Sequence, residues 1–295
     1  MSAVIDRLRL LQRQSGRSPD GAQRVDARAA SLAPHADVVS NIRGDLRRLL
    51  ARRERNGLRT LIAPAGVQLA PGLYQVERRW PSDLACSVRL PPAVNKLRRN
   101  FGAELPAPDA SEVARERLVC FDTETTGLAG GVGTKAFMIG AAFWRGAELI
   151  VVQWYLTALA GEAPMLRAFA GCLPHDAIFV SYNGRSYDAP LLKGRYRMHR
   201  LDSPFDQRAH LDLLHPVRRA YRGVWENCRL QTIERRLLGI VREDDLPGSE
   251  APAAWLAFLR GHSSTPLARV IEHNRQDLLT LTLLLERMGP CDGAA

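Results

Sequence analysis

The chain has 295 residues, of which 46% are hydrophobic and 24% charged, and its formal net charge is +10. At roughly 100–200 residues per domain, this length accommodates one or two domains with a sizeable core, and the composition excludes a disordered chain, a collagen or a disulfide scaffold. Forty-one basic residues against 31 acidic residues favour a polyanionic partner, either nucleic acid or an anionic membrane. Only Lys96, Lys135 and Lys193 are lysines, and the arginine fork suits phosphate oxygens well.

Cysteine spacing and hydropathy indicate the cellular setting. The five cysteines are far apart and form no C-x-x-C pair, so the sequence predicts no zinc ribbon, and the thiols are expected to be reduced. The first residues alternate apolar side chains with arginine, unlike a secretory signal. The longest apolar stretch, residues 137–144, is much shorter than the ~20 residues of a membrane span. We therefore expect a cytoplasmic protein that does not bind membranes.

The N-terminal part divides into two segments. Residues 1–58 form a basic leader, in which residues 4–14 and 38–55 have helical patterns separated by a joint at 15–34. The basic residues of this leader either face solvent or contact phosphates. Residues 59–110 carry short apolar runs broken by proline and glycine, which predicts a few short strands followed by a linker.

An α/β pattern begins at residue 118. The predicted strands are 118–121, 135–144, 148–156 and 177–181, with a hairpin turn at Arg145-Gly146 between the second and the third. The predicted helices are 162–172 and 188–199, and helices dominate after the segment His210-Leu-Asp-Leu-Leu. The last helix, 266–288, is the longest.

The segment Phe121-Asp-Thr-Glu-Thr-Thr-Gly-Leu128 places two carboxylates two positions apart after an apolar run. Alternation along a strand puts Asp122 and Glu124 on one face and points Thr123 away from them. Carboxylates this close repel each other unless a cation bridges them, and Mg²⁺ or Mn²⁺ prefers oxygen ligands. The pair therefore indicates either a divalent-metal site at the end of a strand or two acids that face water.

Two further acidic elements follow in the same stretch. Asp188 lies where a strand gives way to a helix, so it is either a site residue or a residue favoured by the helix dipole. His273 and Asp277 lie four positions apart on the last helix and share a face, so they are either site residues or a surface pair, and this is the weakest of the three signals.

Five segments of the chain resemble the motifs of the proofreading-type (DEDD) 3′–5′ exonucleases of the ribonuclease H-like superfamily, and in particular its bacterial YprB-like branch. They are residues 122–134, the Tyr182-Asn-Gly block, residues 210–215, residues 228–232 and residues 272–277. This resemblance spans about residues 118–285. It implies an α/β fold, a ribonuclease H-like mixed sheet flanked by helices over residues 111–290, preceded by the smaller basic region.

The resemblance also implies a function. A metal-dependent nuclease would hydrolyse phosphodiester bonds, from the 3′ end of single-stranded DNA or RNA, with two divalent cations, Mg²⁺ or Mn²⁺, held by four acids. The residues that match these acids are Asp122, Glu124, Asp188 and Asp277. His273 matches the general base. The expected substrate-binding residues are Thr125, Gly127, Asn183 and Arg185.

The position of His273 departs from the histidine subgroup of that family, in which the base usually lies five residues before the last acid. Here it lies four before Asp277, which is the spacing of the tyrosine subgroup. A histidine titrates near 6.5 and a tyrosine near 10, so the base role is a hypothesis. It predicts an ionisation of the activity at about pH 6–7 that is lost in His273→Ala.

Several other residues keep two interpretations. Asp212 either caps the following helix or supports the metal site, and Asn183 either contacts the scissile region or shapes a turn. Tyr182 and Tyr187 either stack on bases or pack in the core. Arg185 and Lys193 either touch phosphates or are solvated.

Other functions fit less well. Residues 131–136 match a loose dinucleotide-binding pattern, but the strand-like residues 137–144 follow it instead of a helix. No P-loop, H-E-x-x-H or G-x-S-x-G motif is present. Two alternatives remain, namely a catalytically weak nucleic-acid-binding module of the same fold and a scaffold whose basic leader recruits a partner.

Overall fold

The structure, a computed structural model, describes residues 62–81, 87–89, 112–127, 133–243 and 245–288. The helices predicted in the leader, and most of the predicted linker, lie outside these residues. Within them, none of the helices combines the length and the apolar character that crossing a membrane requires. Cys120, Cys172 and Cys228 are free thiols, whereas Cys86 and Cys291 lie outside the described part.

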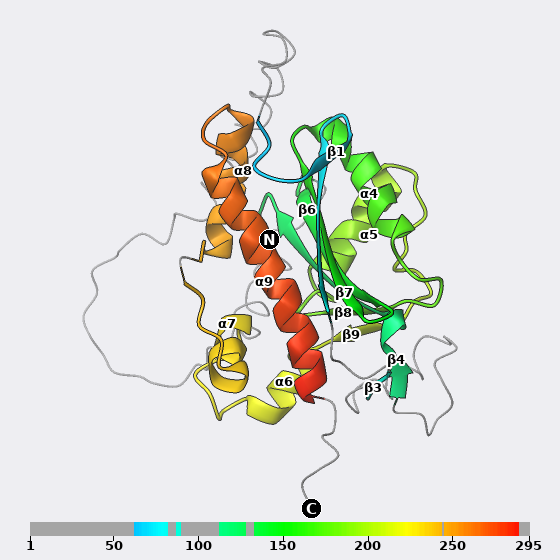
Figure 1. The fold of residues 1–295 in the computed structure, drawn as a ribbon, viewed down its shortest axis with the longest axis vertical. Helices are drawn as coiled ribbons and strands as arrows, with labels where there is room; N and C mark the ends of the chain where they lie inside the picture. Colours follow the sequence, from blue (N-terminus) through cyan, green and yellow to red (C-terminus); the bar gives the residue numbers. More distant parts are fainter. Residues whose placement is uncertain (1–61, 82–86, 90–111, 128–132, 244, 289–295) are drawn as a thin grey trace, which may run out of the picture.

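A seven-stranded mixed sheet forms the centre of the molecule, in the order β1-β2-β7-β6-β5-β8-β9 (Figure 1). Its strands are β1 (Val67–Ala70), β2 (Leu73–Pro81), β5 (Leu118–Thr125), β6 (Ala136–Arg145), β7 (Glu148–Leu156), β8 (Ile178–Ser181) and β9 (His210–Asp212). The first five strands of that order run antiparallel to their neighbours, and β8 and β9 continue the sheet parallel to β5. A separate two-stranded sheet joins β3 (Ser87–Arg89) to β4 (Glu112–Ala114). The predicted α/β class with a mixed sheet is thus confirmed.

Helices cover both faces of this sheet. They are α4 (Glu162–Gly171), α5 (Asp188–Met198), α6 (Leu214–Tyr221), α7 (Leu230–Ile233), α8 (Ala251–Leu259) and α9 (Thr265–Met288). Single helical turns occupy Arg115–Arg117, Leu159–Gly161 and Gly248–Glu250, and α7 continues into a π-helical turn at Glu234–Leu238. Figure 1 shows α4 and α5 on one side of the sheet and α9, with α7 and α8, on the other.

The predicted hairpin is confirmed as β6 and β7. The two strands pair from Met138–Tyr155 to Arg145–Glu148, and Gly146 makes the turn with a positive φ of 56°, which glycine adopts without strain. Almost every residue of both strands is buried because helices cover both faces. A strand, and not the helix of a dinucleotide fold, follows the glycine-rich segment before Ala136.

Three strands of the sheet differ from the prediction, since β1 and β2 lie before residue 111 and β9 was not predicted as a strand. β2 pairs with β7 along its whole length, from Leu73–Leu156 to Pro81–Glu148, so the expected boundary near residue 111 does not separate two sheets. At the opposite edge, residues 210–212 form β9 beside β8. This strand has three residues, which are too few for an alternating pattern to reveal.

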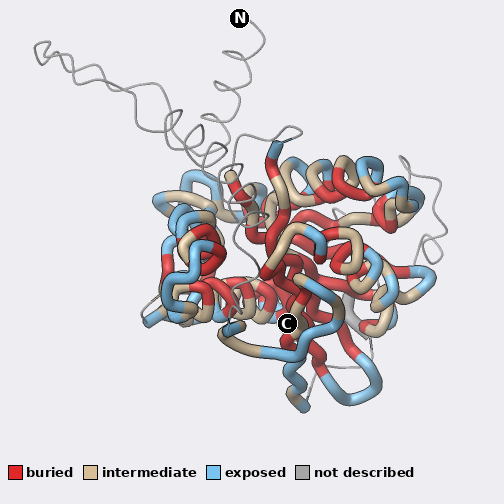
Figure 2. The backbone as a smooth tube through the Cα atoms, turned by 90° about the horizontal axis from the view of Figure 1, so that it is seen from above, coloured by how far each residue is buried: buried red, intermediate tan, exposed pale blue. Residues whose placement is uncertain are grey.

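The core continues through the sheet, and Figure 2 shows the buried backbone at the centre of the molecule. On the α4 side, the Phe121 ring packs against Phe169, Phe179 and Phe205. Cys120, the preceding residue, packs in the cluster that includes leucines of α9. Because side chains alternate along a strand, Asp122 and Glu124 are expected on the α9 side.

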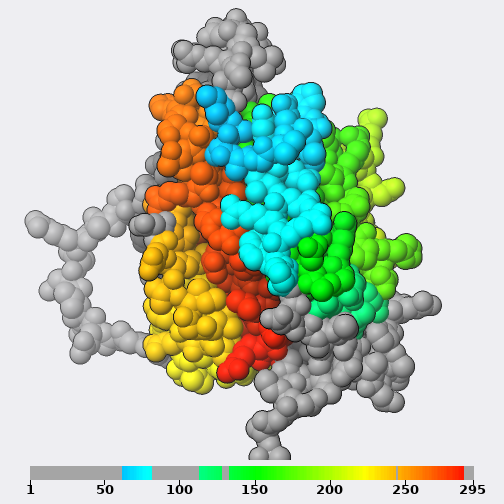
Figure 3. Space-filling model, in the orientation of Figure 1, coloured from blue at the N-terminus to red at the C-terminus, as the bar shows by residue number. Residues whose placement is uncertain are grey.

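Residues 62–81 lie against α8 and α9 on the surface shown in Figure 3. An ion pair between Arg78 Nη1 and Glu272 Oε2 (3.3 Å) joins β2 to α9. Both side chains are about half exposed, so this pair contributes at most about 1 kcal/mol. The position of α9 therefore depends mainly on its buried leucines.

Candidate active site

The first acidic motif lies at the end of β5. Asp122 faces α9, since the Asn274 amide Nδ2 donates a hydrogen bond to Asp122 Oδ2 (2.9 Å). Burial, and then the charges of Asp277 and Asp188, raises the pKa of Asp122 and of Glu124 well above the ordinary values. These acids therefore lie close enough to one another to disfavour their simultaneous ionisation.

The second motif lies in the connection from β8 to α5, which Asp188 begins. The Thr123 hydroxyl donates a hydrogen bond to Asp188 Oδ1, so Thr123, which alternation points away from Asp122 and Glu124, still contacts a residue of the site. Asp188 approaches from the α5 side, where Thr123 faces, and the site thus spans both faces of the end of β5. Burial raises the pKa of Asp188 to about 6, although the hydrogen bond from Thr123 opposes the rise.

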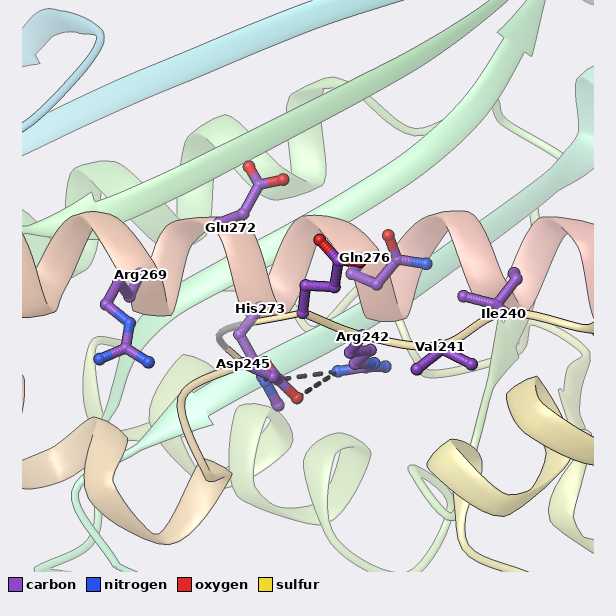
Figure 4. A pocket seen from close by; sticks show the side chains of 9 residues that line it. Ile240, Val241, Arg242, Asp245, Arg269, Glu272, His273 and Gln276 are labelled. Atoms are coloured by element: carbon purple, nitrogen blue, oxygen red, sulfur yellow. Dashed lines mark hydrogen bonds and ion pairs between the residues drawn. The ribbon is translucent and has the colours of Figure 1, made fainter.

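The third motif lies in the middle of α9. His273 and Asp277 are one turn apart, and His273 Nε2 lies 3.7 Å from Asp277 Oδ2. The other ring nitrogen, Nδ1, lies 2.6 Å from Asp245 Oδ1, in the loop before α8 (Figure 4). Burial raises the pKa of Asp277, and the charges of Arg242 and His273 oppose that rise.

A buried arginine lies beside this motif. The Arg242 guanidinium donates to both carboxylate oxygens of Glu234, at 2.6 Å each, and to Asp245 Oδ2 at 3.2 Å. It also pairs with Asp277 Oδ1. The side chains of Arg242 and Glu234 are 8% and 1% exposed, and the single positive charge of Arg242 is shared by three carboxylates, those of Glu234, Asp245 and Asp277.

A second hydrogen bond fixes the Asn274 side chain that contacts Asp122. Its Oδ1 accepts a hydrogen bond from Gln153 Nε2 of β7 (2.8 Å), and that nitrogen also donates to the Ile271 carbonyl (2.7 Å). Gly140 of β6 makes this approach possible, because a Cβ at that position would lie 2.2 Å from Asn274 Oδ1. The sheet and α9 are therefore in close contact directly behind Asp122.

Sequence reasoning missed four of these residues, namely Glu234, Arg242, Asp245 and Asn274. Asn274 lies within residues 272–277, one of the segments that resemble the family, and its position next to His273 could have marked it as a site residue. The segment from Arg242 to Asp245 is a run of charges between two helices, which usually indicates a solvated loop. Its contact with Asp277, across 35 positions, had no local signal.

Two cavities flank the acids. The smaller, of about 270 Å³, is lined by Asp122 and Asp188 together with Thr125, Gly127 and Asn183. Three of the four expected substrate-binding residues thus face one cavity, whereas Arg185 does not line it. The larger, of about 630 Å³, lies between α9 and residues 240–245 and is lined by His273, Asp245 and Arg242 (Figure 4).

The charge of the carboxylates suits a divalent cation, but the distances between them do not. Four acids with raised pKa values are a donor set that hard divalent cations prefer. As placed, however, no three acidic, histidine or cysteine side chains of the described chain form a group that could hold a metal ion. The pairing of Asp277 with Arg242 is one reason, since it turns a carboxylate oxygen toward the guanidinium.

The structure gives contacts for three of the residues with two interpretations. Asp212 accepts the backbone N–H groups of Asn183 (2.7 Å), Arg185 (3.1 Å) and Leu214 (3.1 Å), so it shapes the second motif and also caps α6. Asn183 has a positive φ of 66°, as a turn residue would, and still lines the smaller cavity. Lys193 pairs with Asp206 at 2.9 Å.

Comparison with known proteins shows the family of the chain. Residues 119–289 match the family model described as the RNase_H superfamily. The chain is also 34% identical over 176 residues to the protein described as "Uncharacterized protein YprB" of Bacillus subtilis (strain 168). That match covers 59% of this chain and 42% of the relative, so the chain spans less than half of the relative's length. The family match extends over more than half of the chain, and the chain therefore belongs to the RNase H superfamily and resembles YprB.

Proposed function

We propose that this protein is a metal-dependent 3′–5′ exonuclease that hydrolyses phosphodiester bonds in single-stranded DNA or RNA. Membership of the RNase H superfamily supports nuclease-type chemistry. The single observation that carries the finer proposal is the group of four acids at the end of β5. Burial raises the pKa of each of them, and repulsion from Asp277 and Asp188 adds to the rise for Asp122 and Glu124. Such an imbalance of charge is typical of a site built for divalent cations.

Asp122, Glu124, Asp188 and Asp277 would hold two cations, Mg²⁺ or Mn²⁺, which supply charge stabilisation for an in-line displacement at phosphorus. Thr123 and Asn274 orient two of these carboxylates by hydrogen bonds. The smaller cavity, beside Asp122 and Asp188, suits a terminal nucleotide. Asp277 would turn from Arg242 toward the cations when they bind.

His273 is suited to take a proton from the attacking water. With Asp245 accepting a hydrogen bond from Nδ1–H, the other nitrogen, Nε2, keeps its lone pair. As the water oxygen bonds to phosphorus, its proton passes to Nε2. The bond from phosphorus to the 3′ oxygen of the preceding nucleotide breaks, and that oxygen takes a proton from solvent to become the new 3′ hydroxyl. The products are a nucleoside 5′-monophosphate and a strand shortened by one nucleotide.

The test is degradation of 5′-end-labelled DNA and RNA strands of matched sequence in Mg²⁺, in Mn²⁺ and in EDTA. We expect a ladder that shortens one nucleotide at a time with metal and no degradation in EDTA or with Asp122→Asn. Degradation that persists in EDTA would rule out the proposed chemistry, and cleavage at internal positions would rule out the exonuclease assignment.

A second candidate is a catalytically weak nucleic-acid-binding module of the same fold. The specific observation in its favour is the engagement of Asp277 by Arg242, which leaves no metal-ready group of ligands among the described residues. Salt-dependent binding of an oligonucleotide, with no release of nucleotides at millimolar Mn²⁺, would select this candidate.

A further inference from the structure

The end of α6 and the segment that joins it to α7, residues 218–229, carry several arginines close to the candidate site. Arg219, Arg222 and Arg229 are exposed, and none of them pairs with an acid of the described chain. The acids around them are already engaged, since Glu226 pairs with Arg235 and Arg236 and Asp212 accepts backbone N–H groups. The segment therefore presents uncompensated positive charge to solvent.

The backbone of this segment is held in place. The Tyr221 and Trp225 rings stack with centroids 3.9 Å apart and an interplanar angle of 8°, and both pack against the core cluster beneath them. A backbone bridge joins Arg222 to Trp225, with Gly223 at a positive φ of 83° in between. Because this backbone is ordered before binding, a ligand need not supply the free energy to order it.

The segment is also continuous with the smaller cavity. Tyr182, which lines that cavity with Asp122 and Asp188, donates a hydrogen bond from its hydroxyl to the Cys228 carbonyl (2.6 Å). Burial raises the pKa of Tyr182 and of Tyr187, a second lining residue, and the positive charge of Arg218 opposes both shifts. Arg218 of α6 thus lies near the cavity, and Arg219 and Arg222 follow it along the chain.

We propose that residues 218–229 are the docking surface for the sugar–phosphate backbone of a single-stranded nucleic acid whose end enters the smaller cavity. This inference rests on the proposed function and adds the path of the strand outside the site. Exposed arginines on a fixed backbone suit successive phosphates. A membrane surface fits less well, because Val224 is the one large apolar side chain of the segment that is strongly exposed, at 69%.

The experiment measures binding without turnover. A 5′-fluorescein-labelled oligo(dT) or oligo(U) of 15 nucleotides is titrated with the full chain in EDTA, at several KCl concentrations between 50 and 300 mM, and fluorescence anisotropy is recorded. The test variant is Arg219→Ala/Arg222→Ala. The matched control is Arg167→Ala/Arg197→Ala, which removes two exposed arginines of α4 and α5 and leaves the net charge equal to that of the test variant.

We expect the test variant to bind about tenfold more weakly at 100 mM KCl, with a slope of log K against log salt that is lower by about 1.4, because each lost phosphate contact on a single strand removes about 0.7. The control should bind like the unmodified protein. In Mn²⁺ the test variant should show a raised KM and an unchanged kcat.

Equal binding by the two variants would overturn the docking surface, as would a test variant that loses affinity for vesicles containing phosphatidylserine but not for the oligonucleotide. A different result would contradict the proposed function. If the oligonucleotide binds through this surface but is never hydrolysed in Mn²⁺, the docking inference stands and the exonuclease assignment does not.

Discussion

Two acidic groups in this molecule, the buried Glu162 with its basic partners and the four acids at the end of β5, differ in their balance of charge. Glu162, which is 2% exposed, accepts hydrogen bonds from Arg195 at 2.5 and 2.7 Å. It also pairs with Lys135 (3.2 Å) and His199 (3.1 Å). Burial by itself would raise the pKa of Glu162, but these partners outweigh it, and the pKa is lowered.

The group at the end of β5 shows the opposite behaviour. Asp122, Glu124, Asp188 and Asp277 have raised pKa values, and the nearby Arg242 is shared with Glu234 and Asp245. Burial is common to both groups, so burial alone does not identify a functional acid. An excess of negative charge does identify such an acid, because a folded protein retains this excess at the expense of stability.

The largest effect should separate activity from stability. Replacing Glu124 by Gln removes a ligand and one repelling charge, so we expect turnover in Mn²⁺ to fall at least about a thousandfold while the metal-free protein becomes more stable. Nuclease assays and urea denaturation in EDTA measure the two quantities. Asp202→Asn, an exposed substitution, should change neither. Lower stability of Glu124→Gln would mean that this acid has a structural role like that of Glu162.

The next effect concerns Glu162. Glu162→Gln leaves Arg195, which is 3% exposed, without its carboxylate, and breaking a buried pair in this way costs about 3 kcal/mol of unfolding free energy. Urea denaturation should show this loss, while kcat at a temperature where the variant is folded should match that of the unmodified protein. A large loss of kcat in fully folded Glu162→Gln would remove the contrast between the two groups.

The contact between the sheet and α9 gives a third prediction. Gly140→Ala would place a Cβ 2.2 Å from Asn274 Oδ1 and 2.7 Å from Leu278 Cδ1, so these two side chains, or α9 with them, must shift, at a cost of about 2 kcal/mol. Because Asn274 orients Asp122, activity should fall as well. Gly171→Ala, where a Cβ meets nothing within 4 Å, is the control, and equal stability of the two variants would contradict the close packing behind the site.

The smallest effect is the pH dependence of stability without metal. Because the folded pKa of Asp188 is raised from 3.8 to about 6, the folded state binds more protons than the unfolded state between these values. Stability should therefore be lost as the pH rises through this range, by roughly 3 kcal/mol in all for this group, of which about 1.4 kcal/mol falls between pH 5 and pH 8. Glu162, whose pKa is lowered, acts in the opposite sense and loses its contribution as the pH falls through its folded pKa.

Urea denaturation in EDTA at pH 5 and pH 8 measures this difference. Mn²⁺ should restore stability at pH 8 much more than at pH 5, since the cation binds the ionised carboxylates. Equal stability at the two pH values in EDTA would show that the acids at the end of β5 are compensated by charges of their own.

Much of this arrangement was predictable because its signals are local. The apolar run before Asp122, the turn at Arg145-Gly146 and the spacing of leucines in α9 each depend on a few neighbouring residues, and the hairpin and the last helix were predicted close to their observed limits. Alternation also placed Asp122 and Glu124 on one face. It also pointed Thr123 to the opposite face, but it could not reveal that Asp188, at the start of α5, contacts Thr123 there.

The remaining features depend on distant contacts. β2 joins the sheet through β7, more than 60 positions along the chain, and nothing in its own sequence specifies that partner. The loop from Arg242 to Asp245 joins the site only because the π-helical turn and α9 bring Glu234 and Asp277 to the same place. The charges of such a loop carry no signal until the fold is known.

α9 contributes residues both to the core and to the candidate site, and this limits how the helix can move. Its buried residues, from Leu267 to Leu285, belong to the core, and Asn274 and Asp277 lie among them. A local opening that released these two residues would also expose the surrounding leucines to water, at nearly the cost of global unfolding. The amide hydrogens in the middle of α9 should accordingly exchange with solvent among the slowest of the molecule, and strand entry must proceed without any unwinding of this helix.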